Sequence, residues 1–366
     1  MKRLVTIATY ENPKSAYVLK EVLEEVHIAC YFTFFQDVLK TTGEVRVQVD
    51  EEDVQQAIRI MMQVREEYGE IEQMEPSSAK RKILVPVDFS AVSEHASRFA
   101  VNLARMLDAD VKILHVYENP VAGVRSRDTA SFVDYAELTM EETEKNARSG
   151  MVTFTDRVRK YMKDHELTAV RIHASMVMGF VDESVNRIAD IYRPDLIVLG
   201  ISDDRGQEEG FISALSDSII KAAEFPVYAV SGPFPPAGFG KLNILYATDF
   251  NEKDHSSLDK LLHILEPFEK SITCVHVDTD QNPANRERMD ELNSFLESEY
   301  REHDIRCRLV DDRDVLHGIM EFAELNRINL LSFTTKKRSI FEKLFRPNLF
   351  RRVVHQSELP LLIFHS

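Results

Sequence analysis

The sequence predicts an α/β protein: two doubly wound parallel-sheet domains preceded by a small α+β domain. Three observations carry this prediction. Short, nearly continuous apolar strands alternate with longer helical patterns, as in parallel sheets covered on both faces. This pattern occurs twice in the same order, on either side of a Pro/Gly-rich connector at 231–241. The N-terminal segment has a different order, βαββα, which is typical of a small sheet with helices on one face.

The first predicted domain spans residues 1–75 and is a small α+β domain. Its order comes from five segments with strand or helix spacing: 3–10 (strand), 13–26 (helix), 28–34 (strand), 45–50 (strand) and 52–68 (helix). A polar stretch at 70–82, which contains Pro76, is predicted to be a linker.

The two larger domains are predicted at 81–232 and 241–366. Four segments of the first copy match four of the second: KILVPVDFS (82–90) with NILYATDFN (243–251), KILHVYE (112–118) with ITCVHVD (272–278), DLIVLGIS (195–202) with INLLSFTT (328–335), and FPVYAVS (225–231) with LPLLIFH (359–365). Ligands bind such sheets beyond the carboxyl ends of the strands, at the switch point of the strand order. Asp88, Asp249 and the loop after Gly200 fall at strand ends.

These repeats resemble universal stress protein domains in tandem over residues 81–366. The resemblance is carried by ILVPVDFS, ILHVYE, DLIVLG and SIIKAAEFPVYAV in the first copy, and by ILYATDF, CVHVD and LPLLIF in the second. It implies Rossmann-like sheets of the adenine nucleotide alpha hydrolase type and a role in stress response. The first segment is similar to a small bacterial signal-transducing domain through VTIATYENPKSAYVLKEVLEE and VRVQVDEEDVQQAI, and this resemblance implies a PII-like, ferredoxin-like fold.

The resemblance also gives a test for ATP binding. Members that bind ATP carry G-x2-G-x9-G-[ST] after the fourth strand, where glycines let phosphates approach the backbone. Gly200 fits the first position, but Asp203 replaces the second glycine and Ser213 the third. A carboxylate about 4 Å from a phosphate charge repels it by about 1 kcal/mol in water and about 4 kcal/mol at an effective dielectric of 20. In the second copy Phe333 and Lys336 take the first two glycine positions, so both loops are expected to be degenerate.

The resemblance nevertheless outlines a candidate nucleotide cleft. In the family an Asp after the first strand contacts the nucleoside, and a glycine after the third lies near the ribose. The candidate positions are Asp88, Val116, Gly179, Gly200, Asp203, Ser213 and Asp249. Asp88 and Asp249 can equally cap the helices that follow them, and Gly179 can equally serve a simple turn.

Two alternative functions stay open on the sequence. One is a nucleotide switch or slow ATP hydrolase that uses Asp88, Asp203 with Mg²⁺, and Ser213. The other is binding of a small anion or lipid headgroup by the basic stretch at 334–354 of the second copy. That stretch can also meet the acidic loop of the first copy, or be a solvated charged face over an ordinary core stripe.

Composition excludes several classes. The 366 residues carry a net charge of −16, which disfavours nucleic acid as a partner. No apolar run approaches the roughly 18 residues of a transmembrane helix. Three widely spaced cysteines predict buried or surface thiols in a reducing compartment, without a metal or disulfide framework. His115 and His276, which match between the copies, are expected to be satisfied interior histidines.

We therefore expect a cytoplasmic binding and regulatory module without an assigned enzyme activity and without a resident cofactor. ATP with Mg²⁺ enters only under the nucleotide-switch alternative. The expected partners are proteins of unknown identity, with the first domain as a sensor or docking unit. The two similar domains are expected to pack as an intramolecular pseudo-dimer.

Overall fold

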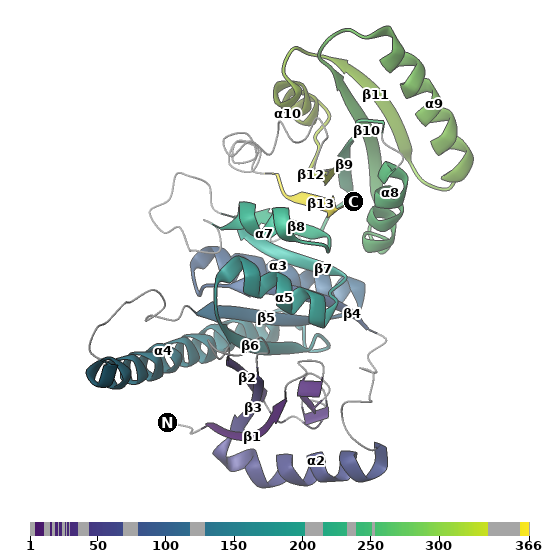
Figure 1. Ribbon diagram of the computed structural model, residues 1–366. Helices are drawn as coiled ribbons and strands as arrows, with labels where there is room; N and C mark the ends of the chain where they lie inside the picture. Colours follow the sequence, from purple (N-terminus) through teal and green to yellow (C-terminus); the bar gives the residue numbers. More distant parts are fainter. Residues whose placement is uncertain are drawn as a thin grey trace. The chain divides into compact units, whose positions relative to one another are not determined.

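The computed structural model describes most of the chain, namely residues 4–10, 15–16, 19–20, 22–23, 26, 28, 30–35, 44–68, 80–117, 129–201, 215–232, 239–250, 253–335 and 359–365. The chain divides into two compact units, and Figure 1 labels the helices and strands of both. The first comprises Met1–Phe89 with Asp108–Pro194, and the second comprises Ser90–Leu107 with Asp195–Ser366. Asp203, Ser213 and the basic residues after Thr335, including Lys336, lie outside the described residues.

The first unit begins with a three-stranded antiparallel sheet. Strands β1 (Leu4–Tyr10) and β2 (Cys30–Phe35) both pair with β3 (Glu44–Asp50), which gives the order β1-β3-β2. The 3₁₀ turn η1 (Glu51–Asp53) then leads into helix α2 (Val54–Tyr68). The helical residues between β1 and β2 bury Ala16, Leu19 and Leu23, the face given by their spacing. These elements follow the predicted order βαββα, while the ferredoxin-like assignment stays a prediction.

The same unit holds the first three strands of the first copy. Strands β4 (Arg81–Val87), β5 (Ala109–Tyr117) and β6 (Ile172–Met178) are parallel and adjacent in that order. Helix α4 (Thr129–Asp164) lies between β5 and β6 in the chain, and helix α5 (Val181–Tyr192) follows β6. Every residue of β5 is buried, as expected for a central strand covered on both faces. The N-terminal domain contacts β6 through Lys20, whose buried ammonium donates to the carbonyl of Ala174 at 2.6 Å.

The second unit holds the remaining elements of the first copy. Helix α3 (Ala91–Leu107) packs on β7 (Leu196–Ile201), which pairs in parallel with β8 (Val227–Ser231). The short helix α7 (Ser216–Ala222) precedes β8. The division of the chain into units therefore does not follow the sequence repeat.

The second copy lies entirely in the second unit and shows the doubly wound fold in full. Its elements are β9 (Leu242–Ala247), α8 (Lys253–Ile264), β10 (Lys270–Asp278), α9 (Pro283–Glu299), β11 (Ile305–Asp311), α10 (Val315–Leu325), β12 (Leu330–Thr335) and β13 (Leu361–His365). The parallel strands run in the order β11-β10-β9-β12-β13, so the order reverses between β9 and β12. This confirms the predicted Rossmann-like architecture and places the switch point there.

The final strands of the two copies pair edge to edge. β13 is antiparallel to β8, with Leu362 opposite Tyr228. The imidazole of His365 contacts two carbonyl oxygens of the first copy, those of Ile220 at 2.8 Å and Phe225 at 3.1 Å. One continuous ladder therefore joins the ends of the two repeats and leaves neither strand as an open edge there.

No helix among the described residues is long and apolar enough to cross a membrane. All three cysteines are free and buried, as the sequence indicated.

Candidate functional site

Each copy places an Asp-Phe pair directly after its first strand. Asp88-Phe89 follows β4 and Asp249-Phe250 follows β9. Both phenylalanines adopt positive φ, 67° for Phe89 and 61° for Phe250. A bulky side chain rarely takes this conformation, so the surrounding packing must hold it. The tight turn positions each aspartate at the carboxyl edge of its sheet.

A histidine on the neighbouring strand holds each phenylalanine. The rings of Phe89 and His115 stack at 4.0 Å between centroids, and those of Phe250 and His276 lie 4.3 Å apart. Nδ1 of each histidine lies 2.9 Å from a backbone carbonyl oxygen at the end of the first strand, that of Val87 or of Thr248. Burial lowers the pKa of His115, partly opposed by its bond to Val87 and by the charge of Asp88. Both are satisfied interior histidines, as predicted.

In the first copy three of the predicted site residues meet at one edge. Asp88 follows β4, Val116 is buried near the end of β5, and Gly179 follows β6. The Gly179 amide donates to the Tyr117 carbonyl at 3.0 Å, and this bond links the ends of β5 and β6. Gly179 has a φ of 157°, and a Cβ there would lie 2.6 Å from the Ser184 hydroxyl oxygen, so glycine fits the turn.

Gly200 has a packing role in β7. A Cβ on Gly200 would lie 2.8 Å from the carbonyl oxygen of Val92 and 3.2 Å from the Cβ of Ala96, both on α3. The missing side chain therefore lets α3 approach the strand closely. This contact accounts for the glycine without a phosphate.

The second copy fills the corresponding place differently. Phe333, the counterpart of Gly200, is buried in β12, and Thr334 beside it faces a polar network. The Tyr246 hydroxyl lies 2.7 Å from Thr334 Oγ1 and donates to Asp254 at 3.2 Å. Thr248 donates to the other carboxylate oxygen of Asp254 at 2.7 Å. Burial, followed by the charge of Asp254, raises the pKa of Tyr246, so its hydroxyl stays neutral and can donate.

A pocket of about 500 Å³ opens beyond the ends of β9, β10 and β11 in this copy. It is lined by Asp249, Phe250, His276, Val277, Thr279, Asp280, Asn282, Asn285, Arg288, Arg313, Asp314, Val315 and Leu316. Asp249 and Val277 are the counterparts of Asp88 and Val116, two of the predicted cleft positions. The structure therefore brings Asp249 and the counterpart of Val116 into one cavity.

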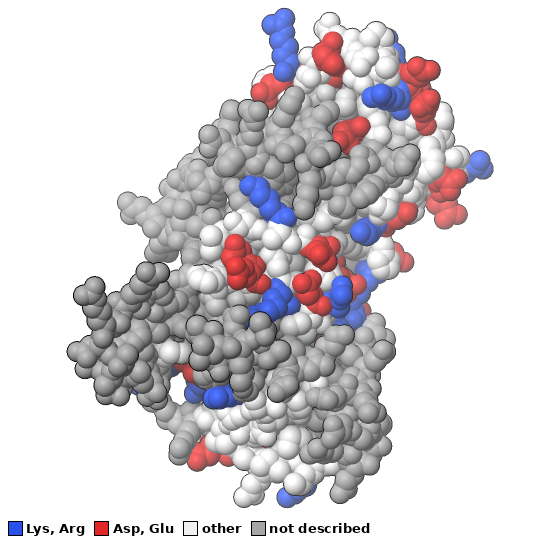
Figure 2. Space-filling view, viewed as in Figure 1, with Lys and Arg blue, Asp and Glu red and all other residues white. Residues whose placement is uncertain are grey.

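Charges of both signs line this pocket. Asp249, Asp280 and Asp314 are balanced in part by Arg288 and Arg313. The same mixture of acidic and basic side chains is seen on the described part of the surface in Figure 2. Such a lining suits a ligand that carries both a polar donor face and an anionic group.

The base of the pocket is fixed by hydrogen bonds. The buried carboxylate of Asp278 accepts from the backbone amide of Asn282 at 3.2 Å and from the Asn285 side chain at 3.1 Å. Asp314 caps α10 by accepting from the His317 amide at 3.0 Å. These contacts hold the first turns of α9 and α10 at the pocket, where the positive ends of the two helix dipoles favour negative charge.

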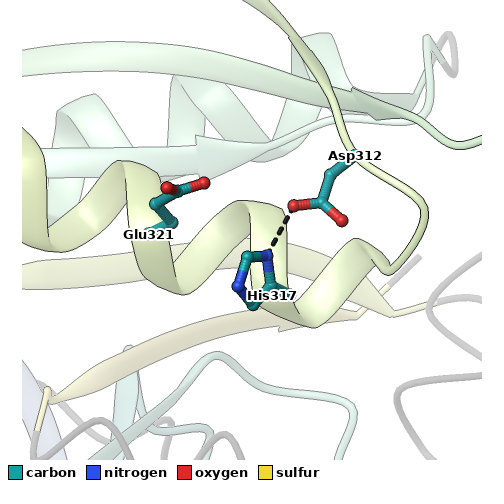
Figure 3. A group of neighbouring side chains, drawn as sticks. All are labelled: Asp312, His317 and Glu321. Carbon is teal, nitrogen blue, oxygen red and sulfur yellow. Dashed lines mark hydrogen bonds and ion pairs between the residues drawn. The ribbon is translucent and has the colours of Figure 1, made fainter.

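A histidine and two carboxylates gather on α10 and the turn before it (Figure 3). The side chains of Asp312, His317 and Glu321 offer metal-ligating atoms within 4.8 Å of one another. Asp312 Oδ2 lies 2.6 Å from His317 Nδ1, and the hydrogen bond and charge of Asp312 raise the pKa of His317. His317 is exposed, and it already forms a hydrogen bond with the half-buried Asp312, so we assign this group no metal.

Sequence reasoning missed most of the pocket. Arg288 and Arg313 belong to helix and loop segments beyond β10 and β11 that have no counterpart among the matched repeat segments. The available signal was topological, since residues that follow neighbouring parallel strands meet at one edge.

Comparisons with known proteins agree with this architecture. A sequence model of the universal stress protein family matches residues 80–231 and 242–365. A universal stress protein of Methanocaldococcus jannaschii is 29% identical over 154 residues, 42% of this chain and 83% of that relative. A second one from the same archaeon is 23% identical over 154 residues, 41% of this chain and 94% of that relative. The crystal structure of a universal stress protein from Archaeoglobus fulgidus superposes with a TM-score of 0.53 at 11% identity, covering 78% of this chain and 96% of that one, which shows the fold.

Proposed function

Because the chain belongs to the universal stress protein family, we propose that it is a stress-response binding and regulatory module that does not hold ATP through a glycine-rich phosphate loop. Its output in this proposal is contact with other proteins in the cytoplasm, with residues 1–75 as the sensor or docking unit. The edge-to-edge ladder between β8 and β13 supports an intramolecular pseudo-dimer of the two family domains.

The observation that carries the proposal is the switch point of the second copy. Phe333 stands there with only 3% of its surface exposed. A phosphate that hugs the backbone needs a position without a side chain, and a buried phenyl ring denies that approach. The hydroxyl and carboxylate groups of Tyr246, Asp254 and Thr334 hydrogen-bond to one another there.

The first copy supports the same proposal by a different route. Gly200 is retained, yet the space that it leaves faces the carbonyl of Val92 on α3. The remaining argument for the first copy comes from the sequence, where Asp203 and Ser213 replace the second and third glycines of the pattern.

Calorimetric titration of the nucleotide-stripped full chain with ATP, with and without Mg²⁺, tests the proposal. We expect no micromolar binding by the wild type. Asp203→Gly, run beside it, is expected to gain affinity, because it removes the carboxylate that repels the phosphates. Micromolar binding by the wild type that requires Mg²⁺ would instead establish the nucleotide switch through Asp88, Asp203 and Ser213.

A second candidate function is favoured by the pocket of the second copy. We propose that it takes a nucleoside monophosphate or a similar small ligand, with Asp249 toward the polar base or sugar and Arg288 and Arg313 toward the anionic group. The support is that all three residues line one cavity. An anion there would be held by arginine forks and not by a glycine loop.

Matched variants at corresponding positions of the two copies test this candidate. Adenosine monophosphate is titrated into Asp249→Asn and Asp88→Asn. Binding that is weakened at least about tenfold by Asp249→Asn but not by Asp88→Asn, a difference of about 1.4 kcal/mol, supports the second-copy site. The reverse pattern would assign the ligand to the first copy. If both variants bind as tightly as the wild type, neither aspartate contacts the ligand.

A further inference from the structure

Two cysteines stand directly opposite each other on neighbouring strands of the second copy. Cys274 on β10 is in register with Cys307 on the parallel strand β11. In-register residues of parallel strands project their side chains to the same face. We propose that Cys274 and Cys307 form a peroxide-reactive thiol pair that closes into an intrachain disulfide.

The separation of the two residues suits this bond. Neighbouring strands lie about 4.8 Å apart, and disulfides span Cα separations of about 4.4–6.8 Å. Both thiols are free and buried, and each is close enough to affect the pKa of the other. No backbone rearrangement beyond a small approach of the two strands is needed to join them.

The surroundings divide the roles between the two thiols. Interaction with the Cys274 thiol, followed by the charge of Arg308, lowers the pKa of Cys307 against the effect of its burial. Interaction with Cys307 and deeper burial raise the pKa of Cys274. These directions agree with a thiolate on Cys307, the thiol on the outer strand, and with a proton that stays on Cys274 until the second step.

Access favours the same assignment. Among the described strands of its sheet, β11 pairs with β10 alone, so it is an edge strand. Cys307 is flanked along it by the exposed residues Arg306 and Arg308. A small oxidant needs only a local opening of this edge to reach Cys307, whereas Cys274 lies one strand further in.

The chemistry balances with hydrogen peroxide as the oxidant. The Cys307 thiolate attacks one peroxide oxygen and the O–O bond breaks. The departing hydroxide is protonated to water, and Cys307 becomes a sulfenic acid. The Cys274 sulfur then attacks that sulfur, the S–S bond forms, the S–O bond breaks, and a second water departs with the Cys274 proton. The pair loses two electrons and the peroxide gains them.

The position of the pair connects it to the pocket. Cys274 precedes the pocket residues His276 and Val277 on β10, and β11 leads from Cys307 to Arg313. Side chains of a disulfide need Cβ atoms only about 3.8 Å apart, closer than strands normally bring them. Oxidation is therefore expected to draw these two pocket walls together and to leave a bond that is readily reduced.

The first test uses the full-length Cys30→Ser variant, which retains only this pair. The protein is treated with hydrogen peroxide, blocked with an alkylating agent and digested with trypsin. Because Arg306 and Arg308 bracket Cys307, the disulfide would attach the dipeptide 307–308 to the peptide 271–286. We expect this linked peptide to form in monomeric protein and to vanish on treatment with dithiothreitol.

Single variants in the same background test the order of the steps. Cys274→Ser is expected to accumulate a sulfenic acid on Cys307, which dimedone traps. Cys307→Ser should label at Cys274 at least about tenfold more slowly, because Cys274 is more deeply buried and lies one strand further from the sheet edge. Alanine variants replace the serine variants if thermal melting shows that the latter are unfolded. Absence of the linked peptide in folded protein, disulfides only between chains, or equal labelling rates would overturn the proposal.

Discussion

The two copies share one architecture but differ where the strand order reverses. In the first copy Gly200 has no side chain, and α3 lies close against β7. In the second copy Phe333 fills that position, and the nearby Tyr246 hydroxyl bonds to both the Thr334 hydroxyl and the Asp254 carboxylate. At the end of the first strand the copies agree, since each packs a positive-φ phenylalanine against a histidine, stacked in the first copy and tilted in the second.

This difference separates what the fold needs from what a ligand needs. The Phe–His stack fixes the first strand end in both copies, so we interpret it as structural. The position after the fourth strand is free to change from glycine to phenylalanine when close approach of a helix or phosphate is not required. Family resemblance therefore transfers the fold more securely than the site.

The largest expected effect comes from emptying the position that distinguishes the second copy. Phe333→Ala should destabilise the protein by about 3–5 kcal/mol, because it removes a buried ring and leaves a cavity. The measurement is the shift of the urea unfolding midpoint at unchanged slope.

Phe180→Ala is the matched control for this change. The Phe180 side chain is 63% exposed, so its removal should change stability by less than about 0.5 kcal/mol. Equal shifts for the two variants would mean that Phe333 does not fill the switch point as described.

The sequence predicted the architecture more completely than the site. Matched apolar segments gave the strands around Asp88 and Asp249 because continuous burial leaves a strong local pattern. The pocket residues Arg288 and Arg313 lie on segments with no such pattern, and only the tertiary arrangement brings them together. The network of Asp254 with Tyr246 was likewise hidden, since neither residue carries a motif.

A smaller effect is expected from changing the first copy at the same position. Gly200→Ala should destabilise by about 1–3 kcal/mol, because the added methyl would meet a backbone oxygen of Val92 that cannot rotate away. Gly240→Ala is the control, since a Cβ there meets nothing within 4 Å. A neutral Gly200→Ala would show that α3 is not held against β7, and Gly200 would again need a ligand to explain it.

The smallest expected effect is a pair of opposite histidine titrations, one in each copy. Burial lowers the pKa of His115 below its ordinary value of 6.5, whereas Asp312 raises that of His317 above it. As pH falls through 6.5, His115 is protonated in the unfolded chain before it is protonated in the folded protein. The contribution of His115 to stability is therefore full above 6.5 and is lost as pH falls further, through the folded pKa. For His317 the contribution is full below 6.5 and is lost as pH rises through the folded pKa.

Proton NMR titration of the imidazole signals measures both pKa values directly. His317→Asn identifies one signal by its disappearance. Asp312→Asn should bring the pKa of His317 back toward 6.5 and leave the pKa of His115 unchanged. The Asp312 carboxylate hydrogen-bonds to His317 and does not contact His115. A His115 signal that titrates at about 6.5 would mean that its ring is open to solvent, and the Phe–His contact would then not be the rigid feature that the two copies share.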